Sequence, residues 1–322
     1  MTTIWCDRRF NAEATRLLEE GTRPHRLIFA EETNPSAPAS ARPDPALEES
    51  DVAFGLPNPR DCLRLSRIRW VEISTAGYTP YDTPAFREGF QARGAALTNA
   101  SGVFAEACAQ HVLAMMLALG RNLLPSHRDQ LTDQGWRSSE KRSHSLLLNG
   151  QTAVLLGFGA IGRRLAELLA PFGMRLFAVR RRTRSETGVR IVPEEDLTRV
   201  LGLADHVINL LPEAESTLNY VNARRIGCFR PGARFYNVGR GATVDQTALL
   251  EGLQSGRIGA AYLDVTAPEP LPPGHPLWTA PHCFITPHTA GGRSDADRAL
   301  VDHFLFNLAA FAAGGEMRDR IL

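Results

Sequence analysis

The feature that most constrains the fold is a glycine-rich turn between an apolar run of strand character and an apolar periodic segment. The run Ala153 to Leu156 enters Gly157-Phe-Gly-Ala-Ile-Gly162, and a segment of helical periodicity leaves it. In such a turn the first glycine permits the tight bend, the second lets a pyrophosphate approach the backbone, and the third lets helix and strand pack closely. The alternative is an ordinary strand-to-helix turn. The strand before it and the helix after it favour a dinucleotide-binding turn formed by Gly157, Phe158, Gly159, Ala160, Ile161 and Gly162.

A cluster of arginines follows the next expected strand, Met174 to Val179, and bears on which dinucleotide binds. An acidic residue normally meets a free ribose 2′-hydroxyl at this point. This chain instead has Arg180, Arg181 and Arg182, whose guanidinium groups can bind a 2′-phosphate through charge-assisted hydrogen bonds. A run of charges can also be a solvated surface loop. The position of the cluster favours NADP(H) over NAD(H), with NAD still possible and with Arg180 and Arg181 as the stronger candidates.

Composition describes a soluble globular protein with no charged partner. Of the 322 residues 43% are hydrophobic and 22% are charged, and the net charge is +1. This balance argues against nucleic acid or an anionic membrane as a partner. The five cysteines are scattered without metal-ligand spacing, so we expect reduced thiols and no metal. The N-terminus lacks the apolar core of a signal peptide, and no run approaches the roughly 18 apolar residues of a membrane span, so the expected location is the cytoplasm.

The chain alternates strands and helices throughout, which predicts an α/β fold with parallel sheets covered on both faces. The first hundred residues contain five expected strands, near 3–6, 25–30, 51–55, 70–74 and 95–99. The second region contains six, at 153–156, 175–179, 206–211, 234–238, 259–265 and 283–286. The prediction is two doubly wound domains: a flavodoxin-like substrate domain and a Rossmann dinucleotide-binding domain.

Two long helices set the domain limits. The segment 103–122 has one apolar face and a second face that is also rather apolar, so we expect an interdomain helix that contributes to a homodimer interface. The polar segment 123–149 could be an arm that reaches the second subunit. A helix expected within 291–313 returns to the N-terminal domain. The predicted domains are therefore 1–99 with 291–322 for the substrate, and 100–290 for the dinucleotide.

Three later strand ends carry reactive side chains, and ligands of open parallel sheets bind at the carboxyl ends of strands. Arg240 lies between two glycines, Glu269 lies in a proline-rich loop, and His288 follows Thr-Pro. A histidine can transfer a proton near neutral pH, a glutamate can orient it, and an arginine can hold a carboxylate. Each could instead be structural or solvated, and His275 and His282 are rivals that spacing does not separate from His288.

A set of motifs strongly resembles the D-isomer-specific 2-hydroxyacid dehydrogenases, which include glyoxylate/hydroxypyruvate reductases. In chain order they are Gly-Phe-Gly-Ala-Ile-Gly, Asn-Val-Gly-Arg-Gly, Leu-Asp-Val-Thr-Ala-Pro-Glu-Pro-Leu-Pro, His-Pro-Leu-Trp and Thr-Pro-His-Thr-Ala-Gly. The resemblance covers residues from about 97 to 292. It is loose in the N-terminal quarter, chiefly Ile73-Ser-Thr-Ala-Gly77 and Leu97-Thr-Asn-Ala-Ser-Gly-Val103.

The resemblance implies a role for each matching residue. Arg240 would bind the substrate carboxylate and carbonyl, His288 would be the general acid/base, and Glu269 would be its partner. Asp264 would meet the nicotinamide amide, and the backbone at Ala76 and Gly77 would receive the substrate carboxylate. The residues implied to line the cofactor are Val103, Leu211, Pro212, Val238, Gly239, His288 and Ala290. Leu56 is added as a candidate for the substrate side-chain pocket.

The chain departs from the family pattern at two places. The family usually has Asp at the position of Arg180, and Gly-Ala-Gly where this chain has Thr75-Ala76-Gly77. The expected activity is hydride transfer between NADP(H) and a small 2-oxo or 2-hydroxy acid, with the D-isomer implied by resemblance. The alternatives are a dinucleotide-sensing, corepressor-like protein and a phosphite- or formate-type dehydrogenase on the same scaffold.

Overall fold

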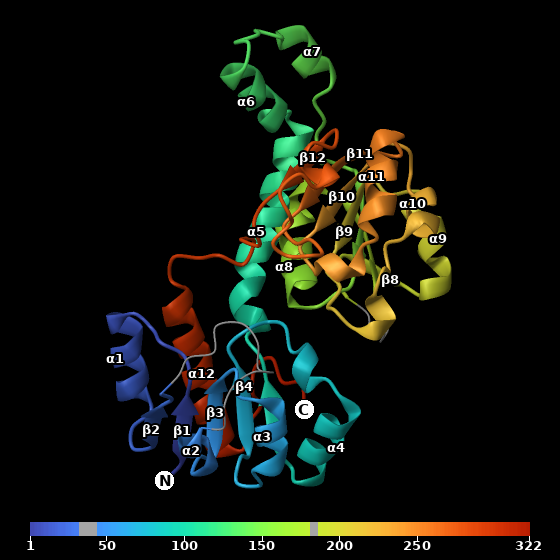
Figure 1. Cartoon of the computed structure of the whole chain (residues 1–322). Coiled ribbons are helices and arrows are strands. Elements are labelled where there is room, and N and C mark those ends of the chain that lie inside the picture. Colours follow the sequence, from blue (N-terminus) through green and yellow to red (C-terminus); the bar gives the residue numbers. More distant parts are fainter. Residues whose placement is uncertain (32–43, 181–185) are drawn as a thin grey trace. The chain divides into compact units, whose positions relative to one another are not determined.

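The chain divides into two units, and its first passage from one unit to the other lies inside a helix. The computed structural model describes residues 1–31, 44–180 and 186–322 (Figure 1). Unit 1 comprises Met1–Phe104 and Arg293–Leu322, and unit 2 comprises Ala105–Gly292. These limits lie a few residues beyond the predicted ones, because the first change of unit falls within the first turns of α5 (Ser101–Gly120).

Unit 1 is built on a five-stranded parallel sheet in the order β2-β1-β3-β4-β5. This is the flavodoxin-like order, as the sequence predicted. Its strands are β1 (Thr3–Cys6), β2 (Arg26–Phe29), β3 (Val52–Gly55), β4 (Trp70–Ile73) and β5 (Ala96–Thr98). Its helices are α1 (Ala12–Gly21), α2 (Pro45–Glu48), α3 (Pro59–Arg64), α4 (Pro84–Ala92) and α12 (Ala296–Ala313), with the 3₁₀ helix η1 (Thr79–Tyr81).

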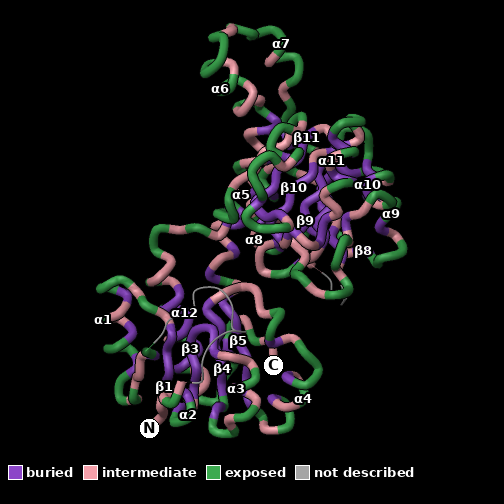
Figure 2. The backbone as a smooth tube through the Cα atoms, in the orientation of Figure 1, coloured by how far each residue is buried: buried purple, intermediate pink, exposed green. Residues whose placement is uncertain are grey.

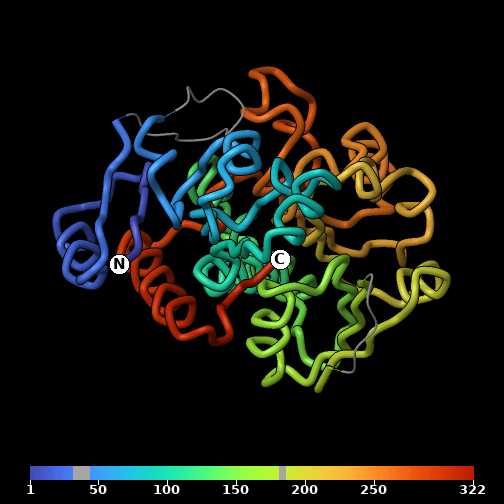
Figure 3. The backbone as a smooth tube through the Cα atoms, turned by 90° about the horizontal axis from the view of Figure 1, so that it is seen from below, coloured from blue at the N-terminus to red at the C-terminus, as the bar shows by residue number. Residues whose placement is uncertain are grey.

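The helices of unit 1 cover both faces of its sheet. On one face α1 and α12 lie side by side, and Phe304 of α12 stacks on Phe54 at 4.2 Å and on Trp70 at 5.2 Å between ring centroids (Figures 1 and 3). On the other face Phe86 and Phe90 of α4 stack on each other, with their ring centroids 4.1 Å apart. Both pack in a buried apolar cluster with residues of the same sheet. The buried strands at the centre of the unit appear in Figure 2. The sheet of unit 1 is therefore buried between two layers of helices.

Unit 2 is built on a seven-stranded parallel sheet in the order β12-β11-β10-β9-β6-β7-β8. The chain reverses direction across the sheet between β6 and β9, the switch point at which doubly wound folds bind ligands. Its strands are β6 (Thr152–Leu156), β7 (Arg175–Val179), β8 (Val189–Val192), β9 (His206–Asn209), β10 (Ala233–Asn237), β11 (Ile258–Leu263) and β12 (Cys283–Ile285). The sequence predicted six of these and missed β8, a short edge strand that exposes Arg190.

The remaining elements of unit 2 connect these strands. They are the helices α6 (Leu123–Leu131), α7 (Ser138–Ser143), α8 (Ala160–Leu169), α9 (Leu197–Leu201), α10 (Ala223–Gly227) and α11 (Gln246–Gln254) and the 3₁₀ helices η2 (Ala170–Phe172), η3 (Glu194–Asp196), η4 (Glu215–Thr217), η5 (Gly241–Thr243) and η6 (Pro276–Trp278). Asp245 caps α11 by accepting from the N–H groups of Thr247 and Ala248, both at 3.1 Å.

Helix α5 is apolar on most of its surface. An 18-residue window of this 20-residue helix has a mean hydropathy of 1.5, so within the described residues it alone is long and apolar enough to cross a membrane. The prediction that no segment approaches this composition is therefore wrong for α5. Length and composition do not separate a membrane span from a core helix, and Ala109, Val112 and Met116 are fully buried in this structure.

Candidate active site

The carboxyl ends of six strands of unit 2 lie level with one another. The register pairs Val179 with Leu156, Leu156 with Asn209 and Asn209 with Asn237. It continues from Asn237 to Leu263 and from Leu263 to Ile285. The glycine turn, the arginine cluster and the motifs of Arg240, Asp264 and His288 each follow one of these strand ends. The structure therefore brings the glycine turn, Arg180, Arg240, Asp264 and His288 to one edge of one sheet.

The glycine turn joins β6 to α8 in the form a dinucleotide requires. Gly157 has φ +91°, a conformation that favours glycine. A Cβ on Gly159 would meet no atom within 4 Å, so space remains there for a phosphate to approach the backbone. Gly159 is also the first residue before α8, and no side chain caps that helix end. The first N–H groups of α8 and the open space beside them fit a pyrophosphate.

Arg180 directly follows β7, where the ribose of a bound dinucleotide would lie. Its guanidinium bonds to the Glu186 carboxylate at 2.8 Å and lies 5.9 Å from the centre of the Phe158 ring. The arginine therefore reaches the glycine turn, and a carboxylate accompanies it. Arg181 and Arg182 lie outside the described residues.

A buried amide network fixes the backbone of Arg240. Asn209 donates to Asn237 Oδ1 at 2.9 Å and to Thr243 Oγ1 at 2.7 Å, and Thr243 donates to the Arg240 carbonyl at 2.6 Å. A Cβ on Gly241 would lie 1.9 Å from the Thr266 carbonyl oxygen, so only glycine fits beside this arginine. Neither Asn209 nor Thr243 was predicted from the sequence. Their only signal is that each is a polar residue next to a buried strand or turn.

Asp264 holds the loop that carries His288. Its buried carboxylate accepts from the Thr286 hydroxyl at 2.5 Å, the Thr289 N–H at 2.8 Å and the Ala290 N–H at 2.9 Å. Its backbone carbonyl accepts from the His288 N–H at 2.8 Å. This positioning function was not predicted for Asp264, and its contact with a nicotinamide amide stays a prediction.

His288 and Glu269 form the pair that the motifs implied. The imidazole Nδ1 lies 2.5 Å from Glu269 Oε1, and both side chains are about half exposed. His288 adopts φ +53°, which turns the residue out of the preceding extended segment. Of its two rivals, His275 accepts from the Leu277 N–H at 3.2 Å and so caps η6, and His282 belongs to the turn before β12. Within the described chain only His288, among these three, contacts a carboxylate.

A second layer of polar groups lies behind Asp264 and was not foreseen. The Tyr262 hydroxyl contacts His111 Nε2 of α5 and Thr286 Oγ1, and lies 3.5 Å from Asp264 Oδ1. Burial raises the pKa of the Tyr262 hydroxyl, so it remains a neutral donor. Burial, followed by the nearby Asp264 carboxylate, raises the pKa of the Cys108 thiol to about 11 although the Arg240 charge opposes it. Cys108 is therefore a thiol and no nucleophile at neutral pH.

The other predicted residues divide between the two units. Leu211, Pro212, Val238 and Ala290 follow strands of unit 2 at the same sheet edge, and Val238 and Ala290 are buried. Leu56, Ala76, Gly77 and Val103 belong to unit 1. Leu56 packs in the apolar core of that unit, and its N–H donates to both oxygens of Asp7 at 3.1 Å. Its predicted place in a substrate pocket stays a prediction.

Known proteins with similar sequences and structures include reductases and dehydrogenases. A glyoxylate reductase of Aeropyrum pernix is 32% identical over 279 residues, which cover 83% of this chain and 81% of that protein. A chloroplastic/mitochondrial formate dehydrogenase of Arabidopsis thaliana is 31% identical over 210 residues, covering 64% of this chain and 54% of that protein. The crystal structure of an NADPH-dependent glyoxylate/hydroxypyruvate reductase of Sinorhizobium meliloti, in complex with NADP and malonate, superposes with a TM-score of 0.73 at 27% identity, covering 99% and 96% of the two chains.

A family model matches the part of the chain that contains the motifs at the sheet edge. The profile of the NAD binding domain of the D-isomer specific 2-hydroxyacid dehydrogenases matches residues 113–290, a range that contains the glycine turn, Arg240, Asp264, Glu269 and His288. The chain belongs to the D-isomer-specific 2-hydroxyacid dehydrogenase family, and it is an oxidoreductase of that family.

Proposed function

We propose that the chain is an NADPH-dependent reductase of small 2-oxo acids of the glyoxylate and hydroxypyruvate type, with the D-isomer as the 2-hydroxy acid. The observation that carries the proposal is the His288–Glu269 pair at the sheet edge that also presents Arg240. An acid/base pair beside a guanidinium suits a substrate with a carboxylate next to a carbonyl.

Each residue has a defined task in reduction. The nicotinamide supplies the hydride when it is bound. His288 gives a proton to the carbonyl oxygen as negative charge develops there, and Glu269 orients the imidazole through Nδ1 so that Nε2 faces the substrate. Arg240 holds the substrate carboxylate and polarises the carbonyl, with its backbone fixed by Thr243 and Asn237. Proton transfer of this kind contributes about 10²–10⁴-fold to the rate.

The preference for NADPH rests on Arg180. Its guanidinium lies after β7 beside Phe158, but it is already paired with Glu186 at 2.8 Å. A 2′-phosphate would have to compete with this carboxylate for the arginine. We therefore expect Glu186→Gln to strengthen NADPH binding and Arg180→Ala to weaken it, with NADH binding little changed in both variants.

The assay compares NADPH and NADH with glyoxylate, hydroxypyruvate, pyruvate and formate for the unmodified protein and for Arg180→Ala. Arg175→Ala is the matched control, because Arg175 begins the same strand at its opposite end and is exposed. We expect Arg180→Ala to lower the ratio of kcat/KM for NADPH over NADH about tenfold or more. An unchanged ratio contradicts the NADPH assignment, and nucleotide binding without turnover of any substrate favours a sensing protein.

A formate-type dehydrogenase is the second candidate, because the Arabidopsis formate dehydrogenase is among the relatives of this chain. Formate has no carbonyl next to its carboxylate, so this activity would leave the Arg240 and His288 arrangement without a second substrate group to bind. NAD(P)+ reduction by formate, with no oxidation of NADPH by the 2-oxo acids, identifies this alternative.

We further propose a cytoplasmic homodimer formed through the segment 123–149 together with α5. The support is a group of large apolar side chains exposed on unit 2: Leu123, Leu131, Trp136, Leu146 and Leu147. In Figure 2 the part that carries α6 and α7 is largely exposed and extends away from the sheet of its unit. Light scattering of the protein and of a Trp136→Ser, Leu131→Ser double variant tests this, and a monomer before substitution contradicts it.

A further inference from the structure

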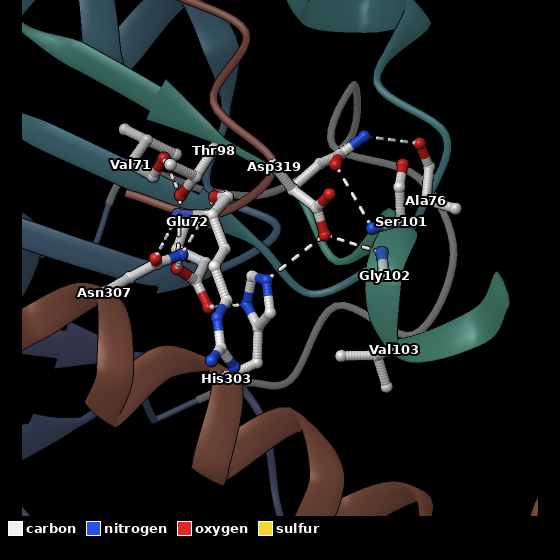
Figure 4. A network of polar contacts seen from close by, with 12 residues as sticks. Val71, Glu72, Ala76, Thr98, Ser101, Gly102, Val103, His303, Asn307 and Asp319 are labelled. Carbon is white, nitrogen blue, oxygen red and sulfur yellow. Dashed lines mark hydrogen bonds and ion pairs between the residues drawn. The ribbon is translucent and has the colours of Figure 1, made fainter. Parts of the chain in front are cut away.

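A buried histidine in unit 1 lies between two carboxylates (Figure 4). His303 of α12 places Nδ1 3.0 Å from Glu72 Oε1 and Nε2 3.2 Å from Asp319 Oδ2. The His303 side chain is 6% exposed and that of Glu72 is 1% exposed. A buried charge is tolerated when it is paired and hydrogen-bonded. Here one imidazolium can pair with two carboxylates.

Both oxygens of the Glu72 carboxylate are hydrogen-bonded within this cluster. Its Oε2 accepts from the Asn307 amide at 2.8 Å and from the Thr98 hydroxyl at 3.1 Å. Asn307 also binds the C-terminal segment, because its Oδ1 accepts from the Arg318 N–H at 2.7 Å. The cluster therefore ties β4, β5 and α12 to the segment that contains Asp319.

Asp319 extends the cluster to the start of α5. Its Oδ2 accepts from the Gly102 N–H at 2.5 Å, so a carboxylate lies at the N-terminus of the helix, where negative charge is favoured. A Cβ on Gly102 would lie 2.8 Å from this oxygen, so glycine permits the contact. Asp319 adopts φ +52°, which Asp and Asn accept more readily than other residues with a side chain.

Asp319 also reaches the turn that is predicted to receive the substrate carboxylate. Its backbone carbonyl accepts from the Asn99 N–H at 3.2 Å. The Asn99 amide donates to the Ala76 carbonyl at 2.8 Å, and its Oδ1 accepts from the Ser101 N–H at 3.1 Å. Asn99 is buried, so a displaced amide would leave polar groups without partners. Figure 4 shows Ala76, Ser101 and Gly102 next to Asp319 and His303.

We infer that Asp319, held in place by His303, is a positioning residue for the reaction, and that it acts through Asn99 on the turn at Ala76 and Gly77. The inference rests on the proposed function, because that function gives the turn its task. Asp319 does not touch the substrate. It fixes the Ala76 carbonyl, and so the plane of the following peptide, in the orientation that the carboxylate of a 2-oxo acid requires.

The first test compares Asp319→Asn with Asp302→Asn. Asparagine keeps the size and tolerates the positive φ of residue 319, but it removes the charge that His303 and Gly102 bind. Asp302 offers the same chemical change at an exposed site of α12, where it pairs with Arg298 at 3.6 Å. We expect Asp319→Asn to raise the KM for glyoxylate about tenfold while kcat stays within about threefold. We expect Asp302→Asn to change neither, and a purely structural role would lower the melting temperature without this KM effect.

The second test asks whether the effect passes through Asn99. If Asp319 acts through Asn99, the KM effects of Asp319→Asn and Asn99→Ala are smaller in combination than their product. Multiplicative effects, or an unchanged KM in Asp319→Asn, overturn the inference.

Hydrogen exchange separates this inference from the proposed function. Peptides that contain residues 74–78 and 99–103 should exchange faster in Asp319→Asn than in Asp302→Asn, whether or not the protein turns over glyoxylate. An enzyme inactive with every 2-oxo acid refutes the proposed function. Unchanged exchange in both peptides refutes the positioning role even in an active enzyme.

Discussion

The two units share a doubly wound parallel architecture, but they finish the carboxyl ends of their strands differently. In unit 2 the strand ends carry side chains suited to chemistry, namely Arg240, Asp264 and His288, each on its own short motif. In unit 1 the corresponding ends offer main-chain turns, which side chains from other parts of the chain hold. Asp7 holds the N–H of Leu56, and Asn99 holds the carbonyl of Ala76. In the proposed reaction, unit 2 would supply the reacting side chains and unit 1 a main-chain turn that orients the substrate.

The largest expected effect tests the catalytic role proposed for His288 in unit 2. We expect His288→Asn to lower kcat about 10³-fold, within the range that loss of a general acid produces, because no other described group at this edge replaces the imidazole. Asparagine accepts the φ of +53° at this position, so the loop should keep its form. Steady-state kinetics measure the loss, and NADPH titration by fluorescence should give an unchanged Kd. A kcat within threefold of the original would move the chemistry away from unit 2.

The same difference explains what the sequence could predict. The glycine turn, Arg240, Glu269 and His288 lie in short local motifs, and strand ends in a parallel sheet meet at one edge, so local patterns and topology indicated that these motifs meet in unit 2. The choice of His288 over its two rivals came from the family resemblance. The alternation of strands and helices predicted two doubly wound parallel sheets, and the structure contains both. The edge strand β8 was missed because its sequence, Val-Arg-Ile-Val, is short and includes an exposed arginine.

The positioning groups were not predictable, because each depends on partners distant in sequence. Asn209 meets Thr243, Tyr262 meets His111, and Asp319 meets both His303 and Gly102. A polar residue beside a buried strand gives no sign of which group will bond to it. Asp264 shows the limit most clearly, since its motif was recognised but its three hydrogen bonds to the His288 loop were not.

The next largest effect is on the pH dependence of stability, to which two buried histidines, His206 and His303, contribute in opposite directions. Burial lowers the pKa of His206 in unit 2 to about 3, with Arg234 adding to the effect. Its ring nitrogens bond to Gln151 and Tyr236, which are neutral partners. Burial would also lower the pKa of His303, but hydrogen bonds to Asp319 and Glu72 outweigh it and raise the value to about 9.

The sign of each effect follows from linkage. Protonated His303 makes its full contribution to the free energy of unfolding at pH values below about 6.5, the pKa of histidine in the unfolded chain. This contribution, about 3 kcal/mol, is lost as the pH rises through about 9, the pKa of His303 in the folded protein. The contribution of His206 is present above about 6.5 and is lost as the pH falls through about 3, so it is constant in the alkaline window.

Urea unfolding between pH 6.5 and 9.5, followed by tryptophan fluorescence, measures the difference. Trp5 and Trp70 are buried in unit 1, whereas Trp136 and Trp278 of unit 2 are exposed, so the signal reports mainly on unit 1. We expect the wild type to lose stability across this window and His303→Gln to lose much less. Parallel curves for the two proteins would refute the charged state of His303.

A smaller effect distinguishes two glycines at the carboxyl ends of the unit 2 strands. A Cβ at Gly241 would overlap the backbone of Thr266, whereas a Cβ at Gly159 would meet no atom within 4 Å. We expect Gly241→Ala to destabilise the protein by about 1–3 kcal/mol. We expect Gly159→Ala to keep the melting temperature and to weaken NADPH binding, because the methyl group would occupy the space of the pyrophosphate. Equal thermal shifts and equal nucleotide affinities in the two variants would show that this space has no function.

The smallest effect concerns Glu269, the hydrogen-bond partner of His288. Glu269 is about two-fifths exposed, so water screens its charge, and its contribution should come mainly from the orientation that it gives to the imidazole. We expect Glu269→Gln to lower kcat only about tenfold, because the glutamine oxygen can still accept from Nδ1. We expect Glu269→Ala to lower kcat further, because no acceptor remains in the proline-rich loop at this position. If both variants lose the same activity, the carboxylate charge rather than the orientation is what His288 needs, and unit 2 then combines electrostatics with positioning in one residue.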